Sequence, residues 1–260
     1  MNTWLVSLMS VLGLTSALAE DAHDGVQLWE NGPYWAVTNL GAEKESDVGY
    51  YYQWGGTTGY AFNGGWKDQN GKSAPGNWYN GSPTYQIDNG VLKPESDAAH
   101  ALWGGSWRLP TAAERDKLNT ECTFTWTTRD GRNGGLFTGK GAFSDKSIFI
   151  PDGGWAGAPG GGCAYYFTGS VAQNGNPTMC SAYYFFPTAK QIAIANVHRG
   201  GKAYTIRAVC DQLDKSAAKG ANKAKTQNKY HKPQPKPQPK KPAVVKPQKR
   251  EQSSKTKKKR

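Results

Sequence analysis

The sequence predicts a mixed fold of short strands, tight turns and long irregular loops, and not a helical bundle. Glycine is abundant, with 32 residues, and the chain holds ten Trp and thirteen Tyr beside few long aliphatic runs. Glycine favours turns, and large aromatic side chains hold irregular loops in place by burying much area each. A single segment carries a well-marked helix signal. Residues 20–213 are long enough for one ordinary domain with its own core.

The predicted helix follows Arg108. Thr111 and Glu114 have capping-box spacing, so that the Thr hydroxyl accepts from the Glu114 N–H and the Glu carboxylate accepts from the Thr111 N–H. Leu118 and Cys122 lie four residues apart and therefore share a helix face that points into the core.

Short strands are predicted in the second half of this body. They are recognised by period-two alternation or by aromatic-rich runs between turn residues. In the last of them, Tyr204, Ile206, Ala208 and Cys210 fall on one face. The predicted strands are Phe124–Thr128, Ser147–Ile150, Cys163–Thr168, Ala182–Phe186, a segment with Ile192 and Ile194, and Tyr204–Cys210.

Residues 59–106 are predicted to form a long, ordered loop that packs on the sheet. Gly, Asn, Asp and Ser dominate the segment. Loops of this length are usually functional or disordered, and the embedded aromatic residues argue against disorder. Those aromatic residues are Trp66, Trp78, Tyr79, Tyr85 and Trp103.

The two ends of the chain differ from the body. Residues 4–14 are apolar and precede Ala17-Leu18-Ala19, which is typical of a cleaved secretory signal over residues 1–19. Residues 214–260 hold seventeen Lys or Arg and two acidic residues, a net charge of +15; because the whole chain carries +12, residues 1–213 carry −3. We expect this Lys- and Pro-rich tail to be disordered, since it has too little apolar surface to fold alone.

The tail is expected to bind anionic polymers. An exported polycation meets envelope phosphates, acidic polysaccharides or anionic lipid headgroups, and nucleic acid is the alternative partner. The residues expected to make these contacts are Lys240, Lys241, Lys257, Lys258, Lys259 and Arg260.

Catalytic signatures are missing from the body. His23, His100 and His198 are scattered, and neither G-x-S-x-G, H-E-x-x-H nor a P-loop occurs. We therefore predict no enzyme, no metal and no cofactor, with hydrolysis of envelope or plant-wall glycans by a carboxylate pair as the alternative. The binding candidates are aromatic residues among Gly, Asn and Asp, for which packing inside the loop is the competing interpretation. They are Trp66, Trp78, Tyr79 and Trp155.

The four cysteines are even in number, as expected for structural disulfides in an exported protein. They are Cys122, Cys163, Cys180 and Cys210, and three pairings are open on spacing alone.

Several motifs in this order resemble a known family. They are Tyr34–Ala42 (Y-W-A-V-T-N-L-G-A), Gly49–Gly55, Trp107–Thr111 with Glu114, Ile148–Pro151, Ala182–Tyr184 and Ile206–Cys210. Across residues 26–211 the chain resembles the Fibrobacter succinogenes major paralogous domain, a family of secreted bacterial domains. That family is similar to C-type-lectin-like domains and to formylglycine-generating enzymes.

The resemblance implies an α+β, C-type-lectin-like domain with small antiparallel sheets, one or two helices, long loops and two disulfides. It also implies a pairing of Cys122 with Cys210 and of Cys163 with Cys180. The E-P-N or Q-P-D triplet of calcium-dependent lectins is missing, because Lys93-Pro94-Glu95 does not reproduce it. A calcium-bridged sugar site is therefore not expected. A formylglycine-generating activity is not expected either, because cysteines held in structural disulfides are not thiolate nucleophiles.

Together these observations predict a secreted or surface-attached bacterial module, located outside the cell or in the periplasm, that binds without catalysis. The body presents loops to a polysaccharide or a surface protein, and the tail attaches to anionic envelope polymers. The alternatives are a glycan-cleaving enzyme and an extracellular nucleic-acid-binding protein that acts through its tail.

Overall fold

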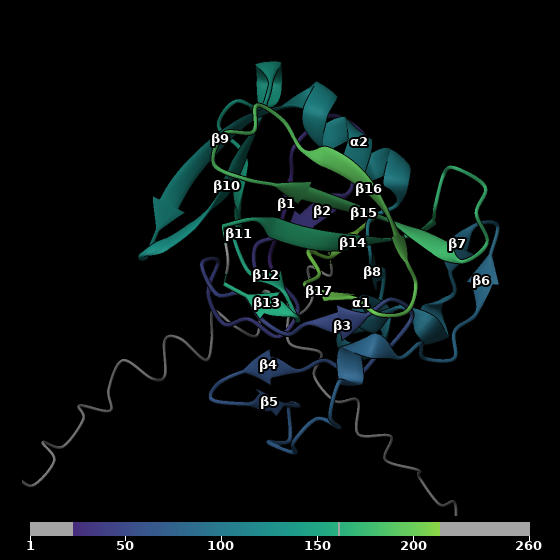
Figure 1. Ribbon diagram of the computed structural model, residues 1–260. Helices are drawn as coiled ribbons and strands as arrows, with labels where there is room; N and C mark the ends of the chain where they lie inside the picture. The colour runs from purple at the N-terminus through teal and green to yellow at the C-terminus, as the bar shows by residue number, and fades with distance from the viewer. Residues whose placement is uncertain (1–22, 161, 214–260) are drawn as a thin grey trace, which may run out of the picture. The chain divides into compact units, whose positions relative to one another are not determined.

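A computed structural model describes residues 23–160 and 162–213, which belong to one compact unit. The expected signal segment 1–19 and the basic tail 214–260 lie outside the described residues. None of the helices in the described part has the length and apolar character needed to cross a membrane. The chain order of the elements is shown in Figure 1.

The elements are short. The helices are η1 (Trp78–Asn80), η2 (Pro94–Ser96), α1 (Ala98–Trp103), α2 (Ala112–Glu121) and η3 (Gly141–Phe143). The strands are β1 (Gly25–Gln27), β2 (Tyr34–Ala36), β3 (Tyr52–Gln53), β4 (Ala61–Phe62), β5 (Trp66–Lys67), β6 (Ile87–Asp88), β7 (Val91–Leu92), β8 (Trp107–Arg108), β9 (Cys122–Arg129), β10 (Arg132–Gly139), β11 (Ser147–Pro151), β12 (Gly154–Trp155), β13 (Ala158–Pro159), β14 (Ala164–Val171), β15 (Met179–Phe185), β16 (Ala193–His198), β17 (Ala203–Tyr204) and β18 (Val209–Cys210).

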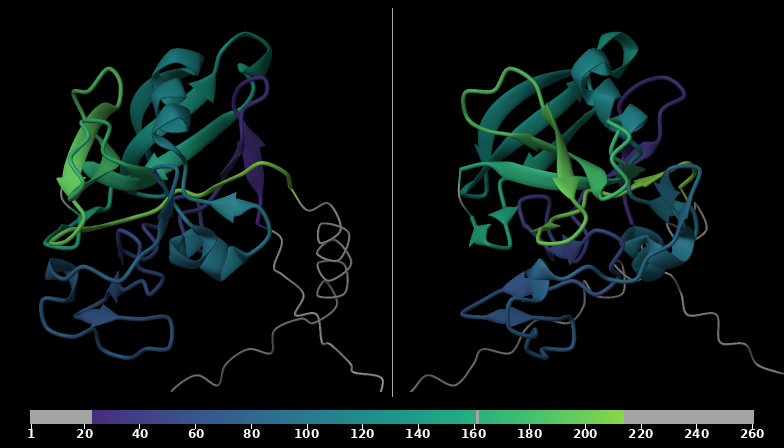
Figure 2. Two further views of the ribbon diagram at one scale, coloured as in Figure 1. Left: turned by 90° about the vertical axis from the view of Figure 1, so that its right-hand side faces the viewer. Right: turned by 45° about the vertical axis from the view of Figure 1, so that its right-hand side comes forward.

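The strands form several small sheets. One has the order β1-β2-β18-β8, so that it joins the first and last strands of the described chain. A second has the order β11-β10-β9, and the largest has the order β13-β12-β14-β15-β16 with β6 and β7 attached to β14. Small sheets with two α-helices confirm the predicted α+β class. Figure 2 shows α2 at one end of the unit and the β4–β5 hairpin at the opposite end.

Helix α2 begins where the capping box predicted. The Thr111 hydroxyl accepts from the Glu114 N–H at 3.2 Å, and the Glu114 carboxylate accepts from the Thr111 N–H at 2.7 Å. Both Glu114 carboxylate oxygens also accept from Arg108, at 2.8 and 2.7 Å. Burial alone raises the pKa of Glu114, but the hydrogen bonds and charge of Arg108 outweigh it and leave the pKa lowered. Leu118 and Cys122 are buried, as their shared face predicted.

The core lies on both faces of the β14–β15 pair. Tyr166 and Tyr183 are paired across the two strands and pack with Leu118 and Phe137 on the α2 side. Phe167, Cys180 and Ala182 pack on the other side with Trp54 and Tyr204, in a separate cluster. This division follows from the alternation of side chains along each strand. Trp35, Trp54 and Trp107 are buried.

A buried arginine joins the sheets. Arg207 has no exposed surface, and it donates to the Asn39 side-chain oxygen at 2.8 Å, to the Ala36 carbonyl at 2.8 Å and to the Phe149 carbonyl at 2.9 Å. Burial lowers the pKa of Arg207. Because the guanidinium binds the segments around residues 36–39 and 149, it fixes both relative to the strand segment that carries Arg207.

The last predicted strand is interrupted. Tyr204, Ile206, Ala208 and Cys210 all face the same cluster, which confirms their shared face. The run nevertheless divides into β17, which pairs with β3, and β18, which pairs with β2 and β8. Between them the backbone carbonyls of Ile206 and Ala208 accept from Leu40 and Ala36, so the chain passes from one sheet to another instead of forming one ladder.

Residues 59–106 are ordered, as predicted, and pack on the largest sheet through β7, where Val91 pairs with Ser170. The segment contains two short hairpins and α1. Asp97 caps α1 by accepting from the N–H groups of Ala99 and His100, and it also accepts from Leu109. Burial raises the pKa of Asp97, and these backbone donors oppose that rise.

The two expected disulfides are missing from the structure, in which all four cysteines are free thiols. For Cys163 and Cys180 the register of β14 against β15 explains why no disulfide forms. Ala164 pairs with Phe185 and Val171 with Cys180, so Cys163 and Cys180 lie at opposite ends of the β14–β15 pair. At about 3.3 Å per residue this separation far exceeds the roughly 7 Å that a disulfide spans between Cα atoms.

Cys122 and Cys210, the second expected pair, pack on opposite sides of β18. Cys122 packs in the cluster that contains Val209, whereas Cys210 packs in the other main cluster. Neighbouring residues of a strand point to opposite faces, so the Cys210 thiol points away from the side on which Cys122 packs. The structure therefore contains neither of the pairings that the family resemblance implied.

Candidate aromatic binding site

The four aromatic binding candidates lie in one cluster. The ring centroids of Trp66 and Trp78 are 5.4 Å apart, those of Trp78 and Tyr79 are 6.0 Å apart, and those of Tyr79 and Trp155 are 6.1 Å apart. All three contacts are edge-to-face, an arrangement that is favourable for aromatic pairs. Rings from residues 66–79 thus meet a ring that follows much later in the chain. This set of residues is called the aromatic cluster below.

Three local structures hold the rings. Trp66 starts β5, η1 carries Trp78 and Tyr79, and Trp155 lies on the β12–β13 hairpin. The hairpin needs a glycine at position 157, because a Cβ there would lie 2.0 Å from the indole of Trp155. Lys202 completes the arrangement, with its Nζ 3.9 Å from the centre of the Trp155 ring. A cation at this distance is attracted by the electron-rich ring face.

The members of the cluster differ in exposure. Trp78 is only 8% exposed, so it supports the other rings from within, and its indole N–H has no hydrogen-bond partner among the described residues. Trp66, Tyr79 and Trp155 are half-buried and each leaves part of a ring at the surface. The packing interpretation therefore holds for Trp78, while the other three remain available to a ligand.

Sequence reasoning missed two neighbours of the cluster. Phe62 is 54% exposed and its ring lies 5.1 Å from that of Trp66. Lys202 follows two glycines and gives no sequence signal that would link it to Trp155. The Gly- and Asn-rich surroundings of Phe62 resemble those of the four candidates, and the same criterion would have selected it.

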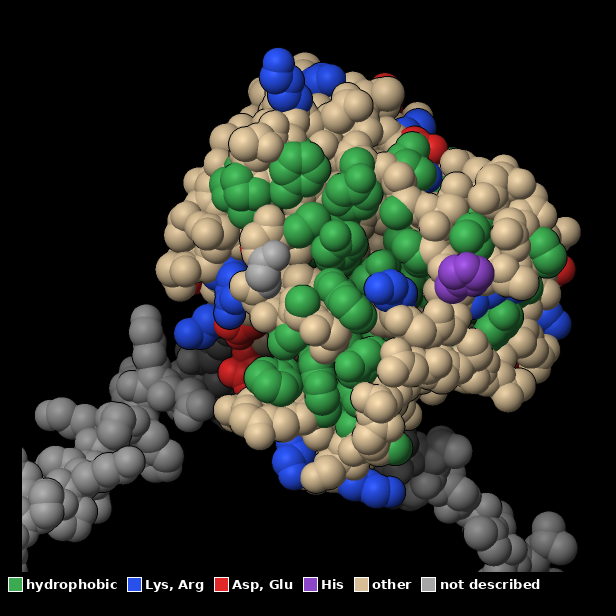
Figure 3. All heavy atoms as spheres, in the orientation of Figure 1, with side chains coloured by type: hydrophobic (Ala, Val, Ile, Leu, Met, Phe, Trp, Pro, Cys, Tyr) green, Lys and Arg blue, Asp and Glu red, His purple; other side chains and the backbone are tan. Residues whose placement is uncertain are grey.

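One face of the molecule carries an extended apolar surface. In Figure 3 hydrophobic side chains form a band that runs down this face of the molecule, with Lys and Arg side chains within it and along its lower border. The exposed or half-exposed residues Tyr184, Phe186 and Ile194 of the β15–β16 region belong to the same type of surface. The centroids of Tyr165 and Tyr184 lie 5.6 Å apart in a stacked pair.

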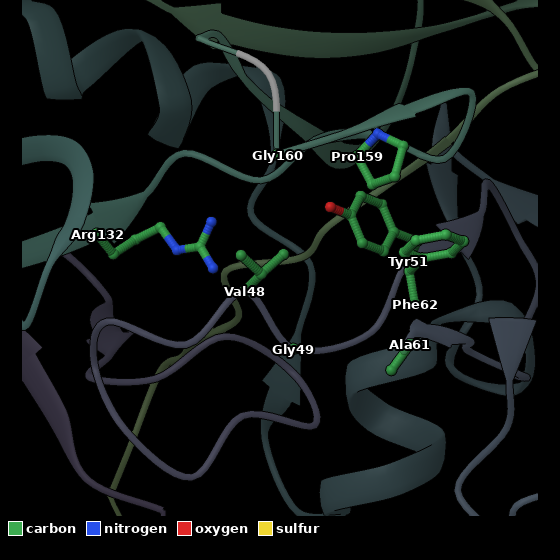
Figure 4. A pocket seen from close by; sticks show the side chains of 8 residues that line it. All are labelled: Val48, Gly49, Tyr51, Ala61, Phe62, Arg132, Pro159 and Gly160. Atoms are coloured by element: carbon green, nitrogen blue, oxygen red, sulfur yellow. The ribbon is translucent and has the colours of Figure 1, made fainter. Parts of the chain in front are cut away.

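An open pocket of about 340 Å³ adjoins Phe62. Figure 4 shows the guanidinium of Arg132 reaching in from one side toward Val48, with the rings of Tyr51, Phe62 and Pro159 on the other side. The Tyr51 hydroxyl donates to the Gly153 carbonyl, and the Tyr51 ring lies 5.3 Å from that of Trp66. The lining residues are Val48, Gly49, Tyr51, Ala61, Phe62, Arg132, Pro159 and Gly160.

The β9–β10 hairpin positions Arg132. Its turn is Asp130-Gly131, with φ of 47° and 77°, and a pair of positive φ angles is typical of the type I′ turn that connects two strands tightly. Arg129 and Arg132 face each other across this turn. Arg129 forms an ion pair with Glu45 and lies 5.5 Å from the Phe149 ring. Arg132 is exposed and forms no ion pair among the described residues.

One buried acid lies near Arg132. Asp152 accepts from the Gly154 N–H at 3.2 Å, and burial raises its pKa while backbone donors and the charge of Arg132 oppose the rise. Its side chain is turned to the backbone of its own loop, which makes it a structural group. Its negative charge still acts on Arg132 at longer range.

The three histidines of the described residues lie in separate segments of the chain, and none lines the pocket. His23 stacks on Trp103 with centroids 3.8 Å apart, His100 belongs to α1 and His198 ends β16. In residues 23–160 and 162–213, no three His, Cys, Asp or Glu side chains gather in a way that suits a metal ion. The expected tail contacts from Lys240 to Arg260 lie outside the described residues.

Comparison of the chain with family models, with curated proteins and with solved structures finds no match. The resemblance to the paralogous domain family therefore remains a prediction, and the function has to be argued from the site itself.

Proposed function

We propose that this protein is a secreted or surface-attached bacterial binding module that holds a glycan on its aromatic cluster without cleaving it. The observation that carries the proposal is the meeting of three partly exposed rings, Trp66, Tyr79 and Trp155, from distant parts of the sequence. Exposing several rings costs hydrophobic stabilisation, and exposed apolar patches mark binding surfaces. Sugar rings present C–H faces that pack on aromatic rings, while their hydroxyls stay in water.

The same proposal includes a C-type-lectin-like arrangement of the body. Small sheets, two α-helices and a long ordered excursion over residues 59–106 support it. The buried cluster of Tyr51, Trp78, Ala156 and Ala203 underlies the excursion and ties it to the later strands. A rigid excursion of this kind keeps the rings in place before a ligand arrives, which lowers the entropy cost of binding.

Binding of neutral polysaccharides to the full-length protein, measured in 0.5 M NaCl, tests the body. High salt suppresses contacts of the tail, whereas apolar stacking persists. Replacement of Trp155 or Tyr79 by Ala is expected to reduce glycan affinity by roughly tenfold, the effect of losing about 1.4 kcal/mol. Trp103→Ala is the matched control, because Trp103 is also half-buried but makes no ring contact with the cluster.

Each variant must keep the circular dichroism spectrum and the melting temperature of the parent protein. Equal loss in all three variants, or no loss in any, would overturn the aromatic site. Release of shortened glycan during the assay would favour the alternative of a glycan-cleaving enzyme.

We propose further that the tail attaches the module to anionic envelope polymers. The net charge of +15 on residues 214–260 supports this, and the body carries −3 with no comparable basic run. Full-length protein with Gln at positions 240, 241 and 257–260 is expected to lose retention on lipopolysaccharide and to show a weaker dependence on salt. Retention on DNA alone, lost in the same variant, would favour nucleic-acid binding by the tail instead.

A further inference from the structure

Arg132 is a charged side chain placed against an apolar pocket wall, and no carboxylate in the described part of the chain forms an ion pair with it. Its partner across the hairpin, Arg129, is neutralised by Glu45, and the Glu45 carboxylate also accepts from the Phe149 N–H at 2.7 Å. Arg132 instead reaches toward Val48, Tyr51 and Phe62. A guanidinium offers five donors in a planar fork that matches a carboxylate, and this one is left free to accept such a group.

The pocket is continuous with the aromatic cluster. Phe62 belongs to the pocket wall and contacts Trp66, and Tyr51 contacts the same tryptophan. On the other side Pro159 lines the pocket and pairs with Gly154 in the hairpin that carries Trp155. A chain-like ligand lying on the cluster would therefore place one of its units beside Arg132.

The charges favour a monoanion. One guanidinium faces the pocket, and the buried Asp152 nearby offsets part of its charge. A ligand group with a single negative charge is neutralised by one arginine, whereas a phosphate dianion would be left in excess beside Asp152. The apolar wall from Phe62 and Tyr51 suits the face of a ring that bears this group.

We propose that the Arg132 pocket binds the carboxylate of a uronic acid unit in a glycan whose neighbouring units lie on the aromatic cluster. This inference rests on the proposed glycan-binding function and adds the substrate class, an acidic polysaccharide. Lys202, held over Trp155, places a second positive charge along the same path.

Titration calorimetry of the full-length protein with trigalacturonate and with its neutral trimethyl ester, in 0.5 M NaCl to suppress contacts of the tail, tests the inference. The ester keeps the sugar rings and their linkages and replaces each carboxylate with an uncharged methyl ester. Arg132→Gln is expected to weaken trigalacturonate binding roughly tenfold or more and to leave binding of the ester within about twofold, because a charged hydrogen-bonded pair is lost for the acid alone. Arg132→Lys keeps the charge but loses the fork, and an intermediate affinity is expected.

Lys117→Gln is the matched control for charge. Lys117 is exposed on α2, at the end of the unit away from β4, and its removal changes the net charge by the same amount. We expect binding of trigalacturonate by this variant to match that of the parent protein within about twofold.

The outcomes separate the two proposals. If Trp155→Ala weakens both ligands while Arg132→Gln weakens neither, the glycan-binding function stands and the carboxylate site falls. If the Arg132→Gln variant binds trigalacturonate more tightly than the ester by the same factor as the parent protein does, other residues cause that preference and the inference is overturned. Failure of trigalacturonate to bind at millimolar concentration, or tighter binding of a carboxylate-terminated peptide than of trigalacturonate, would also overturn it.

Discussion

Two neighbouring tyrosines are predicted to respond in opposite ways to the same chemical change. Tyr166 and Tyr183 are paired across β14 and β15, stack with ring centroids 5.5 Å apart and have no exposed surface. The Tyr166 hydroxyl donates to the Pro151 carbonyl at 2.7 Å and accepts from the Asn39 side-chain amide at 2.8 Å. The Tyr183 hydroxyl has no hydrogen-bond partner among the described residues.

Removal of the Tyr166 hydroxyl leaves one buried carbonyl and one buried N–H unpaired. Each unpaired group costs about 1–3 kcal/mol, so Tyr166→Phe is expected to lower the free energy of unfolding by roughly 2–4 kcal/mol. For a domain of this size that corresponds to a fall of about 5–15 °C in melting temperature. Tyr183→Phe removes an unpaired buried hydroxyl, whose burial costs about 1–3 kcal/mol, and is expected to be neutral or stabilising.

Urea unfolding of the parent protein and of the two variants, followed by circular dichroism, measures both effects. The two tyrosines are equally buried, are paired across the strands and stack on each other, so each variant is a control for the removal of a buried tyrosine hydroxyl in the other. A cost of 2 kcal/mol or more for both variants would show that the Tyr183 hydroxyl is paired, with Arg207 and Arg115 as the charged candidates, because the charges of both oppose the rise in the pKa of Tyr183 that burial causes. A neutral Tyr166→Phe would refute the role of this hydroxyl in joining Asn39 to Pro151.

Two further predictions concern titratable groups. The pKa of Glu114 is lowered in the folded protein, so the ionised carboxylate stabilises the fold at pH values above its ordinary pKa of 4.5, and this stabilisation is lost as the pH falls through the pKa of the folded state. Glu114→Gln is therefore expected to lower the free energy of unfolding by about 1–2 kcal/mol at pH 7 and by clearly less at pH 3. An equal cost at both pH values would contradict the pairing of Glu114 with Arg108. Thiol titration without reductant is expected to find four reactive thiols in the unfolded protein but only that of Cys163 in the folded protein. The other three cysteines are buried, and burial raises the pKa of Cys122 and of Cys180 to about 12 and the pKa of Cys210 to about 11. Fewer than four thiols after unfolding would restore the disulfide expectation.

Local features of the fold were predictable and long-range ones were not. The capping box of α2 depends on Thr111 and Glu114 alone, and the sequence shows both. The aromatic strands were also visible, since alternation is local. The cysteine pairing came from a family resemblance and is not present in the structure, where the register of β14 against β15 decides where Cys163 and Cys180 lie. The division between β17 and β18 likewise depends on partners from residues 36–52.

The candidate site was predicted in part for the same reason. Aromatic residues among Gly, Asn and Asp mark loops that need large side chains to stay ordered, and this signal found Trp66, Tyr79 and Trp155. It could not show that the three meet, because Trp155 reaches Tyr79 only through the packing of the β12–β13 hairpin on the buried cluster beneath η1. Nor could it separate the buried Trp78 from its exposed neighbours.

The positive charge of the pocket depends on which of two arginines has no ion-pair partner within the described residues. Arg129 and Arg132 flank the same Asp-Gly turn and are equivalent in the local sequence. Glu45, 84 residues earlier, pairs with Arg129 because the same carboxylate also accepts from the Phe149 N–H, which anchors it on that side of the hairpin. As a consequence Arg132, beside Phe62 and Tyr51, has no ion-pair partner within residues 23–160 and 162–213. Arg132 is available for binding because long-range contacts of the fold pair Arg129 with Glu45, and no local sequence motif predicts which of the two arginines is paired.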